Sequence, residues 1–182
     1  MYTLNHKYKN ADLLKEWLLE HGFASKKECL VQFFCGIPTE KKMKKVATVL
    51  NDNLPNAHII GTTTDGEISS DNVTTKEVVI SVSIFKKSKI ESVGIKYENN
   101  SYSMGQNMAS LLDGKDVKAM ILFTTGLAIN GEKFLNGVRA ISKGKYVVSG
   151  GMAGDNADFI ENYVSHKDSV INKGAVGVIL IG

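Results

Sequence analysis

HIIGTTTDGEISS, residues 58–70, is the stretch that decides the fold: a short apolar strand runs into a glycine, three threonines and two acids. A glycine after a buried strand lets the backbone turn sharply, and threonines supply hydroxyl donors and acceptors. Two later stretches have the same construction, namely MILFTTGLAING at 120–131 and YVVSGGMAGD at 146–155. Three such loops at one end of a parallel sheet would form a crevice of the kind in which open α/β folds bind ligands.

The elements before this stretch form a βαβ unit. Asn10 is expected to cap a helix over residues 11–21, and Thr39 to open a second helix that ends before Pro55. The strand-forming segment 28–35 lies between these helices. Its partner is the strand that begins at Ala57, and the two strands should therefore be parallel.

After the threonines the hydrophobic pattern changes to strict alternation. Residues 78–85 and 90–97 alternate apolar and polar side chains and predict an antiparallel hairpin at residues 76–97. Segments 159–164 and 175–181 read as two final strands that pair antiparallel.

Helical spacing predicts two more helices, one closed by Gly114 and one that Asn130 caps and Gly144 stops. Buried strands are expected at 119–123 and at 147–148. The predicted fold class is α/β, with a mixed, mainly parallel central sheet, flanking helices and the antiparallel hairpin.

Length and composition indicate one domain over residues 1–182, which we expect to be a piece of a longer protein because an apolar strand runs to Gly182 without cover. The net charge of +3 and a single arginine, Arg139, argue against a nucleic-acid partner. The lysine cluster at 41–45 is expected to face solvent from a helix. No apolar run reaches the ~20 residues of a membrane helix, so no membrane contact is expected from this segment.

The two cysteines, Cys29 and Cys35, flank one predicted strand, and their spacing prevents a disulfide without folding that strand back on itself. They read as reduced thiols, and we expect a cytoplasmic protein.

Three motifs, in this order and at these distances, resemble the amino-terminal FIST domain: FFCG at 33–36, LPNAHIIGTTTDGEI at 54–68 and GGMAGDNADF at 150–159. The resemblance spans the chain from about Glu28 to Ile181. It implies a sensory input domain of bacterial signal transduction that binds a small molecule such as an amino acid. The implied partners are a carboxyl-terminal FIST half and an output domain, which is a histidine kinase, a chemotaxis transducer or a cyclic-dinucleotide enzyme.

An amino acid ligand needs acceptors for its ammonium group and donors for its carboxylate, and the three loops supply both. Acidic side chains serve the first need, while hydroxyls, loop amides and helix amino termini serve the second. The alternative for each acid is that it caps backbone amides within its own loop. The expected ligand-binding residues are Gly61, Thr62, Thr63, Thr64, Asp65, Gly66, Glu67, Thr124, Thr125, Gly126, Gly150, Gly151, Gly154 and Asp155.

Two other functions remain open from the sequence. A small enzyme would act in the same crevice through Asp65, Glu67 or Cys35, the last with His58 as a base, but a buried strand-end thiol is usually inert. A protein interaction module would use a sheet edge. The four histidines have no metal-ligand spacing, and the glycine loops match no nucleotide motif, so we expect neither catalytic residues nor a metal or other cofactor.

Overall fold

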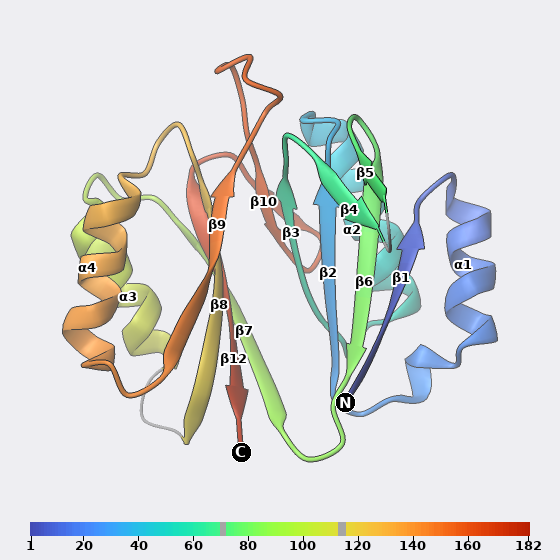
Figure 1. Cartoon of the computed structure of the whole chain (residues 1–182), viewed down its shortest axis with the longest axis horizontal. Helices are drawn as coiled ribbons and strands as arrows, with labels where there is room; N and C mark the ends of the chain where they lie inside the picture. The colour runs from blue at the N-terminus through green and yellow to red at the C-terminus, as the bar shows by residue number, and fades with distance from the viewer. Residues whose placement is uncertain (70–71, 113–115) are drawn as a thin grey trace.

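The computed structural model describes residues 1–69, 72–112 and 116–182, and its strands form two large sheets that pack face to face (Figure 1). The first sheet has the order β1-β6-β2-β3-β10-β11, and the second has the order β7-β12-β8-β9. The strands of the first sheet are β1 (Tyr2–Lys7), β2 (Cys29–Cys35), β3 (His58–Thr63), β6 (Val78–Ile84), β10 (Val164–His166) and β11 (Ser169–Ile171). Those of the second are β7 (Lys89–Lys96), β8 (Val117–Thr125), β9 (Val147–Ala153) and β12 (Gly174–Ile181), and β4 (Glu67–Ser69) pairs with β5 (Asn72–Thr74) in a separate small hairpin.

Helices cover the outer face of each sheet, which gives four layers (Figure 1). The first sheet is covered by α1 (Ala11–Glu20) and α2 (Glu40–Asn53), with a short 3-10 helix, η1 (Phe23–Ser25), after α1. The second sheet is covered by α3 (Ser101–Leu112) and α4 (Gly131–Ser142).

The alternation of side chains along β2 explains how one strand serves two layers. Val31 and Phe33 point outward into the core under α1 and α2, while Leu30 points inward between the sheets. There it packs with Phe123 and Val176 of the second sheet. The first sheet is therefore packed on both faces at β2, as the rich apolar content of that strand requires.

Helix starts follow the sequence closely. Asn10, Thr39 and Asn130 each accept a hydrogen bond from the amide three residues on, at 2.9, 3.3 and 2.9 Å. The predicted caps of α1, α2 and α4 are confirmed. The remaining helix, α3, ends at Leu112, and its predicted stop at Gly114 lies outside the described residues.

The mixed α/β class is confirmed, as is the parallel pairing of β2 with β3. The single central sheet is wrong, because the strands divide between two sheets. Among the described residues β2–β3 and β8–β9 are the parallel pairs, and every other pair is antiparallel. The sheets are thus mixed but not mainly parallel.

The hairpin predicted at 76–97 is also wrong, although both of its strands form. β6 lies between β1 and β2 and has no free edge, so β7 pairs with β12 in the second sheet instead. The residues between them carry the chain from one sheet to the other.

The last predicted pair is wrong in a similar way. Phe159 and Ile160 are each 76% exposed in a loop, and the strand β10 begins only at Val164. β12 pairs with β7 and β8 rather than with β10. Positive φ angles at Asn156, Ala157 and Phe159 exclude an extended strand through that loop.

Candidate functional site

The three glycine-rich loops do meet at one end of the molecule, although they come from different sheets. The amide of Gly154 donates to the carbonyl of Thr63 at 3.0 Å, and the amide of Asn156 donates to Asp65 Oδ1 at 2.6 Å. The amide of Gly126 donates to Asn162 Oδ1 at 3.0 Å. These bonds tie the loops after β3, β8 and β9 to one another across the two sheets.

Most of the threonine hydroxyls are used inside this junction. Thr63 Oγ1 accepts from the amide of Tyr163 at 3.1 Å, and Thr125 Oγ1 accepts from the amide of Gly174 at 3.1 Å. Thr62 donates to the carbonyl of Thr63. All three side chains are buried; the hydroxyls of Thr63 and Thr125 link segments that are distant in the sequence, whereas that of Thr62 bonds within β3.

The acidic residues also have hydrogen-bond partners within the domain. Glu67 is 1% exposed and accepts from the hydroxyl of Thr64 at 2.6 Å and from the amide of Glu77 at 3.1 Å. Asp155 is 5% exposed, and its Oδ2 accepts from the amides of Ile160 and Glu161 at 2.7 and 3.2 Å. Asp155 therefore has the capping role that the sequence left as its alternative, whereas Glu67 binds the Thr64 hydroxyl within its loop and a backbone amide outside it.

The remaining predicted glycines lie around the junction. Gly61 is buried in β3, where a Cβ would meet the ring of Phe33, and Gly66 is exposed beside the small hairpin. A Cβ on Gly154 would meet the carboxylate of Asp65. Gly61 and Gly154 need small residues because their neighbours are close, whereas a Cβ on Gly66 would have room.

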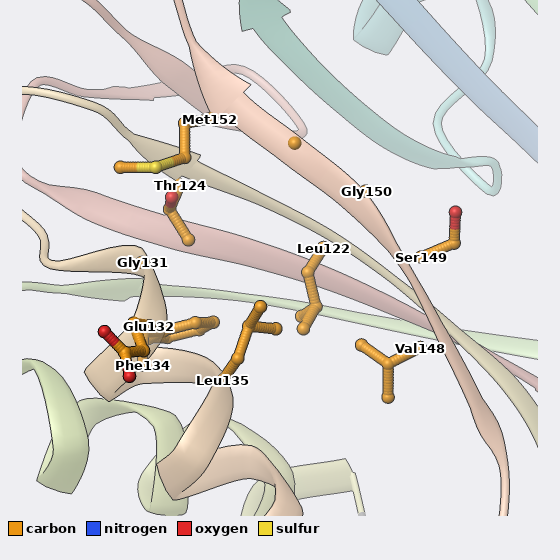
Figure 2. Close-up of a pocket in the computed structure, with 11 residues that line it drawn as sticks. Leu122, Thr124, Gly131, Glu132, Phe134, Leu135, Val148, Ser149, Gly150 and Met152 are labelled. Atoms are coloured by element: carbon orange, nitrogen blue, oxygen red, sulfur yellow. The ribbon is translucent and has the colours of Figure 1, made fainter.

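A cavity of about 550 Å³ lies beside this junction, between the second sheet and the amino-terminal half of α4 (Figure 2). Figure 2 shows Leu122 of β8, Leu135 of α4 and Val148 of β9 gathered between sheet and helix, with Ser149 pointing away from the helix. The cavity is lined by Leu122, Thr124, Gly131, Glu132, Phe134, Leu135, Val148, Ser149, Gly150, Gly151 and Met152.

Two glycines keep this cavity open. Gly150 has φ +147°, and a Cβ there would collide with the carbonyl of Leu122. A Cβ on Gly131, the first residue of α4, would lie 2.9 Å from the sulfur of Met152. Glycine at both positions lets the helix start and the strand approach without filling the space between them.

Thr124 is the one predicted threonine that faces this cavity. Its side chain is 4% exposed, and its hydroxyl has no hydrogen-bond partner among the described residues. A buried hydroxyl without a partner costs free energy, because the group has lost its water. Such a group at a cavity wall is positioned to bond a ligand or an ordered water.

Thr124, Gly150 and Gly151 are the predicted site residues that line the cavity. The sequence reasoning missed its apolar wall, formed by Leu122, Phe134, Leu135, Val148 and Met152, and also missed Gly131 and Glu132 at the start of α4. One available signal was the Asn130-Gly131 pair, which places a capped helix start beside a glycine strand.

A second, more polar hollow of about 410 Å³ lies beside the first sheet, at the start of α2. Asp155 is the predicted site residue that lines it, together with Asp158 and Glu161 of the same loop and Lys76. Its apolar contribution comes mainly from Ile37, Pro38 and Ile160.

The Cys35 and His58 pair considered for catalysis does not assemble. In the parallel register of β2 and β3, His58 lies opposite Leu30 and Cys35 lies opposite Thr63, so about 17 Å of strand separates them. Burial raises the pKa of Cys35 to about 11, which keeps the group a thiol at neutral pH. Cys29 is likewise a free, buried thiol, and both cysteines are reduced as predicted.

His58 instead belongs to a bridge between the two sheets. Its Nδ1 lies 3.0 Å from Ser92 Oγ of β7, and the same hydroxyl lies 3.0 Å from His166 Nε2 of β10. Burial, as the largest cause, lowers the pKa of both imidazoles. Neutral imidazoles suit this arrangement, because one hydroxyl can donate to one ring and accept from the other.

Comparison with known protein families identifies the family to which this chain belongs. A family model described as the FIST N domain matches residues 29–182. The chain belongs to the FIST N domain family. A comparison with curated proteins finds no match for the chain. FIST domains are generally sensory domains of signalling proteins, and this membership supports a sensory role. Within the part of this FIST N domain that the structure describes, no helix is long and apolar enough to span a membrane.

Proposed function

We propose that this FIST N domain is the ligand-sensing input of a signalling protein, and that the cavity between β8, β9 and α4 binds a small molecule such as an amino acid. The observation that carries the proposal is the buried, unpartnered hydroxyl of Thr124 in the wall of a 550 Å³ cavity. Ligand pockets are typically of this size and combine an apolar lining with a few converging polar groups.

The polar groups match the two ends of an amino acid. The first turn of α4 offers backbone amides at Gly131 and Glu132, and the helix dipole favours a carboxylate there. The Glu132 side chain, which is exposed at the same end, supplies an acceptor for an ammonium group. Leu122, Leu135 and Val148 would enclose an apolar side chain.

In the proposed complex, the residues that contact the ligand directly include Thr124, Gly150 and Gly151. The other predicted site residues hold the three loops in place. They are residues 61–67, Thr125, Gly126, Gly154 and Asp155. Ligand occupancy would then act on the output by favouring one arrangement of these loops. We propose further that the domain acts in the bacterial cytoplasm with a carboxyl-terminal FIST half and an output domain.

The direct test is a thermal-shift and calorimetric screen of the protein against the individual amino acids. A ligand present at 100 times its Kd should stabilise the fold by about 2.7 kcal/mol. Thr124→Val keeps the shape of the side chain but removes the hydroxyl, so it should weaken binding about tenfold. Ser165→Ala is the matched control, because Ser165 is also buried with an unpartnered hydroxyl but lies in β10, away from the cavity.

Binding that survives Thr124→Val unchanged, or that Ser165→Ala weakens equally, would contradict this site. Consumption of the bound molecule would favour the enzyme alternative, and its loss in Glu67→Gln would place the chemistry at the loop junction instead.

A further inference from the structure

β9 is the edge of the second sheet that carries no charge. The other large-sheet edges in the described structure are protected: β7 carries Lys89, Glu91 and Lys96, β1 carries Lys7, and β11 is three residues long. β9 has seven residues, VVSGGMA, and no described strand pairs with its outer side. Its Val147 and Met152 are 69% and 49% exposed.

The charges around β9 lie at its two ends and have opposite signs. Arg139, Lys143 and Lys145 come shortly before Val147, at the end of α4 and in the turn that follows. Glu132, Asp158 and Glu161 are exposed around the Met152 end, where Lys133 and Lys76 are the opposing cations. The edge is therefore basic at its amino end and acidic at its carboxyl end.

We infer that β9 pairs with β9 of a second copy of this chain, as antiparallel strands related by a two-fold axis at Gly150. Two identical strands related by such an axis run antiparallel, so the basic end of each copy meets the acidic end of the other. Centred on Gly150, this register sets Val148 opposite Met152 and brings Lys145 of each copy toward the loop that carries Asp158 in the other.

The pairing would satisfy the unpaired backbone groups of β9 and cover its exposed apolar side chains. It supplies hydrogen-bond partners for the outer backbone groups of β9 and covers Val147 and Met152, which a monomer leaves in water. The two glycines at the axis face each other without side chains. The second sheet of each copy would then continue into that of the other.

Sedimentation velocity over a wide range of protein concentration tests this dimer. Met152→Lys places a charge on the strand and should raise the dimer dissociation constant about tenfold or more. Val73→Lys is the matched control, because Val73 is 74% exposed on β5, which pairs with β4 in a separate hairpin and not in the sheet of β9, and should leave the constant unchanged. A protein that stays monomeric throughout, or a dimer weakened equally by both changes, would overturn the inference.

The charge pattern provides a test that does not alter β9 itself. Lys145→Glu should weaken the dimer up to about fivefold, and adding Asp158→Lys to the same chain should recover part of the loss. An Asp158→Lys addition that weakens the dimer further would contradict the antiparallel arrangement.

Spin labels on Val147→Cys measure the register directly. Residue 147 lies three positions from the axis, so the two labelled backbones should be about 20 Å apart along the strands. The native thiols, Cys29 and Cys35, are buried, and burial raises the pKa of each to about 11, so they should not take the label. A dimer with a clearly longer separation would show that another surface forms the contact.

Discussion

Gly150 and Gly151 are neighbours in β9, yet their surroundings allow very different substitutions. Gly150 has φ +147° and no room for a Cβ, whereas a Cβ on Gly151 meets nothing within 4 Å. We expect Gly150→Ala to lower the free energy of unfolding by about 2 to 3 kcal/mol. Gly151→Ala should change it by less than about 0.5 kcal/mol. Urea denaturation of the two variants measures this difference, and equal effects would contradict the described backbone of β9.

Replacing Thr124 should change stability in the opposite direction, toward a more stable protein. Its hydroxyl is buried without a partner, so Thr124→Val removes a desolvated polar group and keeps the side-chain volume. We expect the ligand-free protein to gain about 1 kcal/mol in the free energy of unfolding. Thermal melting without added ligand tests this, and a clear loss of stability would mean that the hydroxyl has a structural partner.

At the residue scale the sequence predicted what depends on near neighbours. The caps at Asn10, Thr39 and Asn130 follow from bonds that span three residues. The partner of a buried hydroxyl depends instead on distant strands. Thr63 and Thr124 both lie near the end of a strand before a polar loop, but the hydroxyl of Thr63 bonds Tyr163 whereas that of Thr124 has no partner among the described residues.

The bridge from His58 through Ser92 to His166 is a joint between elements of different sheets. Ser92→Ala would leave two partly buried imidazole nitrogens without their shared partner, and we expect a loss of about 1 to 2 kcal/mol. Ser69→Ala, at a half-buried serine outside the bridge, is the comparison variant. Similar losses in the two variants, measured by urea denaturation, would argue that the bridge contributes little.

The same joint predicts how stability depends on pH. Burial lowers the pKa of His58 and His166, and nearby Lys167 acts in the same direction, while Glu28 and Glu91 oppose it at His58. The unfolded chain therefore binds more protons than the folded one below about pH 6.5, so stability falls as pH drops from 7 toward 5. The pKa of His6 is also lowered, by burial first and then by His21 and Lys9. This third imidazole therefore adds to the loss of stability at low pH.

Denaturation at a series of pH values measures this slope. Replacing His58 and His166 together by glutamine should flatten it, even if the absolute stability changes. A slope that stays the same in the double variant would assign the pH dependence to other groups.

Element boundaries were predictable because they depend on local periodicity, and strand partners were not. The alternation at 78–85 and 90–97 gave two strands correctly, as β6 and β7. The alternation does not reveal which strands pair with β6, and in the structure β1 and β2 occupy its two edges. The cavity escaped prediction for the same reason, because its wall forms only where α4 packs over β8 and β9.

At the scale of the whole molecule, the two sheets are interleaved along the chain. The first sheet takes β1 to β3 and β6, the second takes β7 to β9, and the chain then returns for β10 and β11 before β12. Leu30, Phe123 and Val176 share one core between the sheets. The first sheet, and the core between the two sheets, therefore need residues from both ends of the described chain.

This interleaving predicts a single unfolding transition. Trp17 packs against His6 and Phe23 and reports on the side of the first sheet, whereas far-UV circular dichroism reports on all elements. We expect the two signals to give the same midpoint in urea, as two-state unfolding requires. Separate midpoints would mean that each sheet, with its own helices, unfolds independently.

The place of β12 between β7 and β8 also sets the order of events during translation. β7 and β8 leave the ribosome well before Gly174–Ile181 is synthesised, so the nascent chain carries both strands with unpaired backbone facing the gap between them. Within this domain the strand that joins the second sheet thus emerges after both of its neighbours, and until it arrives those two strands depend on protection from aggregation.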